Sequence, residues 1–397
     1  MKHGLILVCC TFLFLGCSGD GAEDTYLPEE ENAQPLTPEV PATEKKELSY
    51  REATFAWITN MQQANGLLES AEYTNFVSLY DNSLAAIAFM LDGKAERAEL
   101  IFDYFEAQMA SELLQGSGGF FQFRDREGLE GSRTWMGDNA WLLIALNQYH
   151  ELTGTQRYGV LATELESWLR SLQDQDGGLW GGFNEDGSQI PKVTEGIITA
   201  FNAVPGYDGF HIGILNFLRE QRWESGQMLL LAQTEEARYQ YALDLHSLGF
   251  LIFEDFPASA LHESERYLNT QTATLSGVEL QGYGFDEDRD VVWLEGTAQM
   301  ALAFRQAGML YKTEALMGHI EKAFIHSTIA DGAKGLPYTA NYGTNFGATP
   351  LWDHADSTPA LSSSIWYIFA QHNFNPLVAG EAKNLPDHDK FWLPPVQ

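Results

Sequence analysis

An acidic or polar residue opens each of six apolar, helix-like segments that recur along the chain. They begin at Asp81 (DNSLAAIAFML), Asp138 (DNAWLLIAL), Glu195 (EGIITAF), Asp244 and His246 (DLHSLGFLIF), Glu295 (EGTAQMALAF) and near Ser362 (SSIWYIFA). Successive markers are 49 to 67 residues apart, which is typical of stacked helical hairpins. Because equivalent points of such a repeat lie at one end of the fold, the acids are expected to gather around one cavity. Opposed carboxyls there can work as general acid and general base.

Glu195 and Glu295 are the predicted catalytic pair. Glu295 follows Trp293-Leu294 and precedes Gly296 in an otherwise apolar segment, and a buried acid without a function is rare. For Glu195 the non-catalytic alternative is a first-turn acid that interacts favourably with the helix dipole. The dipole lowers a carboxyl pKa, so burial has to outweigh it for a general acid. The sequence leaves open which glutamate is acid and which is base.

Asp81 and Asp138 share an Asp-Asn pair placed just before an apolar run. Either aspartate alone is explained by N-capping, for which Asp is a preferred residue. Their repetition at one end of the fold favours a second interpretation, in which Asp81, Asp138 and Asn139 bind substrate. Asp290, in the acidic stretch 286–290, is an alternative base, although a solvated acidic loop is the favoured explanation of that stretch.

Between these six segments lie segments of a different kind, which mix charged and apolar residues at steps of three and four. They cover residues 47–65, 94–113, 156–173, 209–225, 258–269 and 311–329. A one-sided apolar stripe indicates a helix with one buried face, whereas the first set is apolar nearly all round. Six buried and six amphipathic helices in alternation predict an all-α fold, the (α/α)6 barrel.

The connections identify the functional end of this barrel. Turns after the buried helices need only a few residues, whereas the loops that lead back to them are long: 114–137, 174–193, 270–292 and 330–360. Long loops in a compact domain are usually functional, and these are rich in glycine and aromatic rings suited to stacking on sugars. Further predicted substrate-binding residues are Trp135, Trp180, His246, Trp293, Tyr342 and Trp352.

Composition restricts the ligand. The formal charge is -32; residues 18–47 carry nine Asp/Glu against two Lys and the leader one Lys, so -26 remains for the rest. Such a field repels nucleic acid and anionic lipid and favours a neutral carbohydrate. No EF-hand spacing and no His/Cys set for zinc occur in the sequence, so neither metal nor cofactor is expected. We expect a monomer.

The first residues predict export. One lysine precedes about a dozen apolar residues, too short a stretch for a mature transmembrane helix. The stretch ends in Phe14-Leu15-Gly16-Cys17, which resembles a bacterial lipobox, and all three cysteines lie in this leader. Residues 1–17 are thus predicted to be a lipoprotein signal peptide with Cys17 lipidated, residues 18–47 an acidic, proline-rich linker, and residues 48–397 the catalytic domain, anchored to the cell envelope. A plain secretory leader is the alternative.

Two stretches carry a resemblance to a known group of proteins. Arg133-Thr-Trp-Met-Gly-Asp-Asn-Ala-Trp141 and Val292-Trp-Leu-Glu-Gly-Thr-Ala-Gln-Met300 resemble motifs of the six-hairpin glycosidase superfamily, and the likeness extends over about residues 48–375. It implies the (α/α)6 toroid and a glycoside hydrolase. Inversion, with carboxyls about 6.5–9.5 Å apart, is our expectation, and retention stays open.

Three other functions remain open at this point. A sugar epimerase of the same fold needs histidines, for which His211, His246 and His354 are the available set. A polysaccharide lyase acting on uronates needs Arg124, Arg126, Arg133 and Arg289 to gather in the cleft. A non-catalytic glycan-binding lipoprotein needs the aromatic rings but no opposed acids.

Overall fold

The computed structural model describes residues 47–129, 131, 133–233, 240–346, 349–377 and 383–394. The predicted signal peptide with Cys17 lies outside these residues, as does the predicted linker apart from Glu47. From Glu47 onward the chain forms one compact unit. Within the described residues, no helix combines the length and the hydropathy needed to cross a membrane.

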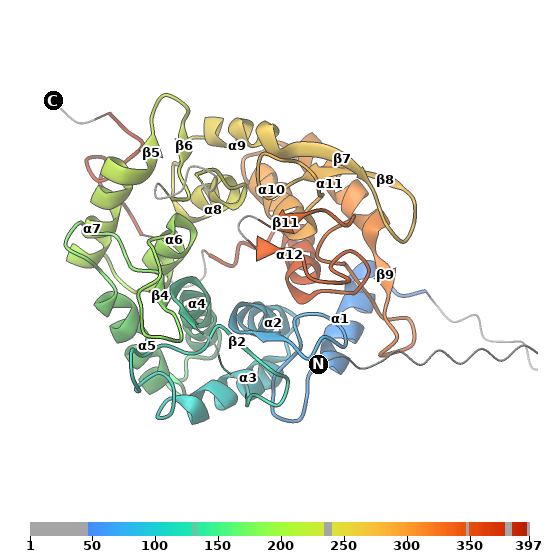
Figure 1. Ribbon diagram of the computed structural model, residues 1–397, viewed down its shortest axis with the longest axis horizontal. Coiled ribbons are helices and arrows are strands. Elements are labelled where there is room, and N and C mark those ends of the chain that lie inside the picture. Colours follow the sequence, from blue (N-terminus) through green and yellow to red (C-terminus); the bar gives the residue numbers. More distant parts are fainter. Residues whose placement is uncertain are drawn as a thin grey trace, which may run out of the picture. The chain divides into compact units, whose positions relative to one another are not determined.

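Six helices form a closed inner ring (Figure 1). They are α2 (Leu79–Leu91), α4 (Met136–Thr153), α6 (Thr194–Ala203), α8 (Asp244–Ile252), α10 (Leu294–Gln306) and α12 (Leu361–His372). Each packs against the next, and α12 packs back on α2. Their residues are buried nearly all round, and small residues let the backbones approach. A Cβ on Gly196 of α6, for example, would lie 2.9 Å from Met136 Cε of α4.

The outer helices alternate with the inner ones along the chain. They are α1 (Tyr50–Met61), α3 (Ala95–Gln108), α5 (Gly159–Ser171), α7 (Gly209–Phe217), α9 (Ser259–Glu263) and α11 (Leu310–Ile320). Each buries one stripe; in α5 it consists of Leu161, Leu165, Trp168 and Leu169. Spacings of three and four residues put these side chains on one face, which covers the inner ring. The predicted (α/α)6 barrel is confirmed.

Short antiparallel strand pairs stiffen the loops. The pairs are β1 (Val77–Ser78) with β2 (Phe123–Arg124), β3 (Thr134–Trp135) with β4 (Gly182–Phe183), β5 (Trp223–Glu224) with β6 (Leu229–Leu230), β7 (Leu268–Thr272) with β8 (Glu279–Tyr283), β9 (Ile325–His326) with β10 (Lys334–Gly335), and β11 (Asn345–Phe346) with β12 (Thr349–Pro350). The β1–β2 and β3–β4 pairs join loops of neighbouring hairpins, so the loops at this end support one another.

The two ends of the ring are built differently. We call the end where the inner helices begin the mouth and the opposite end the closed end. Connections at the closed end are short, such as 92–94 and 307–309, whereas those at the mouth include 109–135 and 321–360. After α12 the chain crosses the closed end. Gln148 of α4 donates to Pro376 O (2.6 Å), Asn202 of α6 donates to Leu377 O (2.6 Å), and Asn375 donates to Leu251 O of α8 (2.8 Å).

Candidate active site

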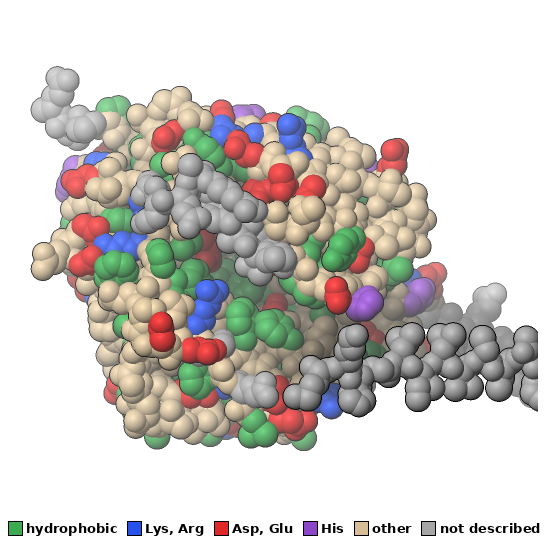
Figure 2. All heavy atoms as spheres, in the orientation of Figure 1, with side chains coloured by type: hydrophobic (Ala, Val, Ile, Leu, Met, Phe, Trp, Pro, Cys, Tyr) green, Lys and Arg blue, Asp and Glu red, His purple; other side chains and the backbone are tan. Residues whose placement is uncertain are grey.

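Five inner helices place a carboxyl in their first turn, at the mouth. The residues are Asp81 of α2, Asp138 of α4, Glu195 of α6, Asp244 of α8 and Glu295 of α10; α12 has Ser362 instead. Electrostatic interactions link Asp138 to both Asp81 and Glu195, Asp244 to both glutamates, and Glu295 to Asp81. We call this closed set the carboxyl ring. Figure 2 shows a hollow in the middle of the helix ring, with acidic side chains inside it.

Burial raises the pKa of every member of the carboxyl ring. Desolvation is the main cause throughout, and it lifts Asp81 and Asp244 to a pKa of about 7 and both glutamates to a pKa of about 8. The pKa of Asp138 rises well above its ordinary value because like charges on Glu195 and Asp81 add to desolvation. Burial and mutual repulsion thus outweigh the helix dipoles. Protonated and ionised carboxyls can coexist here near neutral pH.

Glu295 is held by neutral hydrogen-bond donors. Its Oε1 accepts from Tyr80 Oη (2.6 Å) and from Gln299 Nε2 (3.2 Å), and Ser362 supplies a further hydrogen bond. Tyr80 Oη itself accepts from Trp366 Nε1 (2.8 Å), so its proton is directed to the glutamate. The side chain of Glu295 is 4% exposed and fixed in orientation.

Glu195 lies more open to the cavity. Thr199 Oγ1 donates to its Oε1 (3.2 Å), and the Trp141 indole supplies a second hydrogen bond. A Cβ on Gly137 would lie 3.0 Å from Glu195 Oε2 and 2.9 Å from Trp135 Nε1, so glycine lets the carboxyl and the indole reach the same point of α4.

An aromatic cluster connects the surroundings of the two glutamates. Trp141, which donates to Glu195, has its ring 5.5 Å from that of Tyr80 and 5.9 Å from that of Trp366. Tyr80 in turn donates to Glu295. One apolar wall, drawn from α2, α4 and α12, therefore desolvates and orients both carboxyls.

Two of the other ring members, Asp138 and Asp244, have an oxygen atom without a partner. Asp138 Oδ2 and Asp244 Oδ1 are buried and accept no hydrogen bond. A buried polar atom left unpaired costs about 1–3 kcal/mol, so these atoms are suited to binding a ligand hydroxyl group. Among the described residues, no group of three or more His, Cys, Asp and Glu is arranged to hold a metal ion.

In each Asp-Asn pair the aspartate belongs to the carboxyl ring and the asparagine anchors a loop. Asp81 and Asp138 are each the third residue of their helix, so the N-cap explanation is wrong for both: Ser78 caps α2, and Trp135 occupies the N-cap position of α4. Asn139 is fully buried and binds Phe120 N (2.9 Å), Phe120 O (3.0 Å) and Trp135 O (2.8 Å). It anchors the preceding loop with both amide hydrogens and its oxygen, and its full burial keeps it away from substrate.

Asn82 does the same for the first hairpin. Its side chain accepts from Leu68 N (2.9 Å) and donates to Leu68 O (3.0 Å) and Ser78 O (2.9 Å). The asparagine of each pair therefore positions a mouth loop, while the preceding aspartate faces the ring.

The predicted aromatic residues are spread over the mouth. Trp293 is buried and hydrogen-bonds Tyr338, whose ring lies 4.4 Å from that of Trp352 (40% exposed). Trp180 carries Lys192 over its ring at 4.9 Å, and Tyr342 is 59% exposed on the loop after β10. Trp135, beside Glu195, carries the guanidinium of Arg133 over its ring at 5.1 Å.

Other predicted residues lie away from the carboxyl ring or are already bound. His246 points from α8 to Ala260 O of α9 (2.8 Å), and burial lowers its pKa to about 4. Asp290 Oδ2 accepts from Thr344 N (2.6 Å) and from the Thr344 hydroxyl, which ties two mouth loops together. His211 belongs to the closed end, and His354 is exposed on a loop.

Several residues around the two glutamates escaped the sequence analysis. Asp244 marks one of the six repeats, but the sequence does not distinguish it from His246 two residues later. Tyr80, Trp366 and Gln299 lie inside apolar segments, where an aromatic or amide side chain looks like ordinary core. Tyr338 is linked electrostatically to Glu295 and Asp81, and nothing in its loop sequence indicates that. The position of Tyr80 directly before an acid was the one available signal.

Solved structures of carbohydrate-active proteins share this architecture. A wild-type glycosidase matches with a TM-score of 0.56 at 14% identity, over 82% of this chain and 96% of that chain. Cellobiose 2-epimerase from Bacillus thermoamylovorans gives 0.55 at 10% identity, over 81% and 97%. An alpha-amylase from Clostridium perfringens gives 0.59 at 11% identity, over 82% and 98%.

At the level of sequence, no protein-family model and no curated protein matches. At identities of 10–14% the likeness establishes the fold and no more. The chain therefore has the six-hairpin, glycosidase-like (α/α)6 fold that its motifs predicted.

Proposed function

We propose that the protein is a glycoside hydrolase that cleaves a neutral oligo- or polysaccharide with Glu195 and Glu295 as its carboxyl pair. The observation that carries this proposal is the carboxyl ring: buried acids with raised pKa values, placed at the mouth and partly without hydrogen-bond partners. Glycoside hydrolysis needs one protonated and one ionised carboxyl at the same pH. A set of acids that repel one another supplies both forms.

The hydrogen bonds around each glutamate suggest its role. Glu295 accepts from Tyr80, Gln299 and Ser362, and donors to a carboxylate stabilise its ionised form. Glu195 has two donors, is less buried, and interacts with Asp138 and Asp244. We assign Glu295 as the base and Glu195 as the acid.

Inversion replaces the leaving oxygen at the anomeric carbon by a water oxygen in one displacement. Glu295 takes a proton from a water molecule while the water oxygen forms a bond to the anomeric carbon. The bond from that carbon to the leaving oxygen breaks, and Glu195 delivers its proton to that oxygen. Asp138 and Asp244 are placed to accept hydrogen bonds from sugar hydroxyl groups through their free oxygen atoms.

A uronate-cleaving lyase has little support from the arginines. Arg124 is buried in an ion pair with Glu112 (2.8 Å), and Arg126 is exposed beside Glu69 and Glu127. Arg133 interacts with Asp138, but one guanidinium among five acids does not offset their charge. A neutral substrate avoids this repulsion.

A histidine-based epimerase is supported no better. His246 hydrogen-bonds the outer helix α9, and His211 lies at the closed end with both ring nitrogens bound. Neither imidazole faces the carboxyl ring.

Two substitutions test the pair and its roles together. Glu195→Gln and Glu295→Gln are assayed on neutral oligosaccharides, with anomeric NMR of the products, beside Glu96→Gln, an exposed glutamate on α3. We expect each ring variant to lose about 10²–10⁴-fold in kcat and the control to match the unsubstituted protein. On glycosyl fluorides, whose leaving group needs no proton, Glu195→Gln is expected to recover and Glu295→Gln is not. Turnover of neutral oligosaccharides left intact in both ring variants would refute the proposal.

A further inference from the structure

A second pocket, of about 420 Å³, opens at the mouth outside the carboxyl ring. It lies between the end of α1, the loop that precedes α2, the turn after β2 and the loop after β9. Its volume is within the range of small-molecule sites in proteins, and it accommodates a sugar ring.

Tyr73 is the prominent residue of this pocket. Its side chain is 69% exposed, and its backbone has φ +60°, in the left-handed region. That conformation is unfavourable for a bulky residue, and such strain persists where the surroundings enforce it, often at functional sites. The exposed ring gains no burial in return. Folding alone therefore does not explain a tyrosine at this position.

The neighbouring Glu72 fixes the strained loop. Its Oε2 accepts from Trp57 Nε1 (3.1 Å), and its Oε1 accepts from Thr328 N (3.0 Å) and Thr328 Oγ1 (2.9 Å). Thr328 Oγ1 also lies 3.3 Å from Tyr73 Oη. The tyrosine ring is thus presented to solvent on a rigid support, which lowers the entropy cost of stacking a ligand on it.

The polar groups of the pocket fit sugar hydroxyls. Glu69 lines it with a side chain that is 7% exposed, and Arg126 Nη1 lies 3.7 Å from Glu69 Oε1. Asn60, Gln63, Glu127 and Thr328 supply the rest of the polar lining. A carboxylate, a guanidinium and amides beside an aromatic face can bind adjacent hydroxyl groups of a neutral sugar.

The same loop leads into the carboxyl ring. Ser70 Oγ accepts from Ser78 N (2.9 Å) and also hydrogen-bonds Asp81, while Ser70 O accepts from Leu361 N at the start of α12 (2.8 Å). This short stretch therefore links the pocket to α2 and α12 of the inner ring. A glycan chain that leaves the cavity over this loop therefore passes the exposed ring of Tyr73.

We propose that the Tyr73 pocket is a second saccharide-binding site, which holds a sugar unit of a neutral glycan several units away from the bond that is cleaved. The inference that the ligand is a neutral glycan rests on the proposed function. The position of the binding site rests on the pocket alone. Long chains are then bound at two places and short chains at one, so the site selects for chain length.

Binding without turnover tests the site. In a Glu295→Gln background, maltodextrins, cellodextrins and mannan oligosaccharides, each as trisaccharides and as fractions of about eight units, are titrated by calorimetry. For the chain type that binds, Tyr73→Gly is expected to lower affinity for the long fraction about tenfold and to leave the trisaccharide unchanged, since one aromatic stack contributes about this factor. Tyr73→Phe keeps the ring and is expected to keep the affinity. Tyr311→Ala removes a comparably exposed ring (73%) on α11 and is the matched control.

The outcomes separate the two proposals. Equal long-chain affinity with and without the Tyr73 ring would overturn the second site, as would binding of none of the probes. The protein could bind long chains more tightly than trisaccharides, in a way that depends on Tyr73, and yet hydrolyse neither. This result would support the second site and contradict the proposed function. Tyr73→Gly also relieves the backbone strain at φ +60°, so an unchanged or raised unfolding temperature excludes misfolding as the cause of weaker binding.

Discussion

At the mouth, Asp138 has a buried carboxyl oxygen without a partner and like-charged neighbours, and its pKa is raised. At the closed end, Asp208 accepts from Phe210 N (3.0 Å), lies 3.0 Å from Arg170 Nη1 and contacts His211 Nδ1 (3.0 Å), and its pKa is lowered. Asp138 lies in the first turn of the inner helix α4, and Asp208 is the N-cap of the outer helix α7. The surroundings of Asp208 stabilise its ionised form, whereas those of Asp138 destabilise it.

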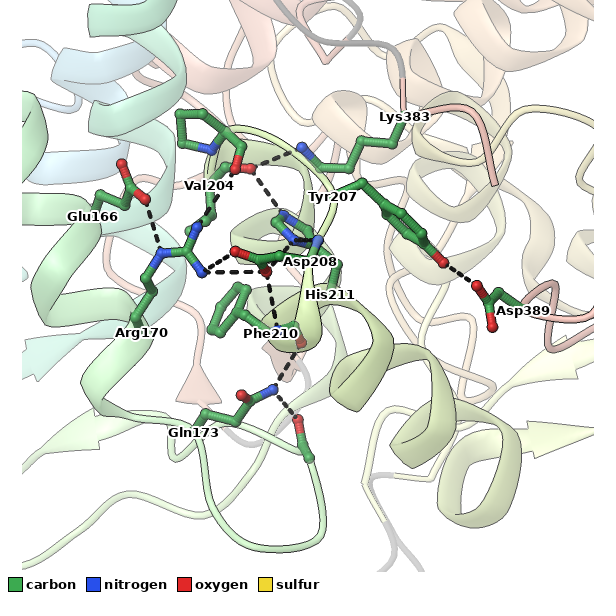
Figure 3. A network of polar contacts seen from close by, with 12 residues as sticks. Glu166, Arg170, Gln173, Val204, Tyr207, Asp208, Phe210, His211, Lys383 and Asp389 are labelled. Atoms are coloured by element: carbon green, nitrogen blue, oxygen red, sulfur yellow. Dashed lines mark hydrogen bonds and ion pairs between the residues drawn. The ribbon is translucent and has the colours of Figure 1, made fainter. Parts of the chain in front are cut away.

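The closed-end network joins three parts of the chain (Figure 3). Arg170 comes from α5, Asp208 and His211 from the start of α7, and Lys383 and Asp389 from the C-terminal segment. Lys383 Nζ donates to Val204 O (2.7 Å), and Tyr207 Oη donates to Asp389 (2.5 Å). Opposite charges and satisfied donors fix this end, so it can support a mouth in which like charges are kept close. Stability and reactivity are thus assigned to opposite ends of one barrel.

The largest expected effect is the loss of His211 at the closed end. The imidazole is fully buried, binds Val204 O (3.0 Å) and Asp208, and lies edge-on to Phe201 and Phe210. His211→Ala leaves a cavity and unpaired polar groups, which we expect to cost about 3 kcal/mol or more of unfolding free energy in urea denaturation. Asp138→Asn at the mouth should cost little or nothing. A larger loss for Asp138→Asn than for His211→Ala would break the comparison.

A smaller loss is expected within the mouth itself, at the anchoring asparagine. Asn139→Ala removes three hydrogen bonds and leaves both polar groups of the Phe120 backbone without this partner, which should cost about 2 kcal/mol. The adjacent Asp138→Asn is the matched variant, expected to lower activity and keep stability. If Asn139→Ala lowered activity alone at full stability, the proposed division of tasks within the Asp-Asn pair would fail.

The sequence predicted the barrel well because its signals are periodic. Stripes such as Leu161, Leu165, Trp168 and Leu169 determine which face of a helix is buried, and the unequal connection lengths locate the mouth. The apolar residues around Glu295 in the sequence also marked it as an unusual acid. These inferences depend only on neighbours along the chain, which the sequence displays directly.

The surroundings of the site could not be predicted, because they depend on contacts between distant segments. Tyr80 donates to Glu295 across 215 positions, and Trp366 donates to Tyr80 across 286. Asn139 was misjudged as a substrate ligand for the same reason: its partner is a loop backbone at Phe120, and backbone groups carry no sequence signature. His246 was chosen over Asp244 because the repeat gives the position of a residue but not the direction of its side chain.

The smallest effect, and the most specific, is the pH dependence of stability. The pKa of Glu195 is about 8 in the folded protein and is ordinarily 4.5, so the folded state holds this proton more tightly than the unfolded state. The raised pKa favours folding below about pH 4.5, and this contribution is lost as pH rises towards 8.

Glu195→Gln removes the titration. Its stability should match that of the unsubstituted protein near pH 5 and exceed it by about 1 kcal/mol near pH 8. One isolated group offers about 1.36 kcal/mol per pH unit, or about 4 kcal/mol over these three units. The expected gain is smaller because neighbouring carboxyls share the protons. Denaturation at several pH values measures this, with Glu96→Gln as a control that should follow the unsubstituted curve. Parallel curves for Glu195→Gln and the unsubstituted protein would show that the mouth does not destabilise its charges, and the contrast with Asp208 would then disappear.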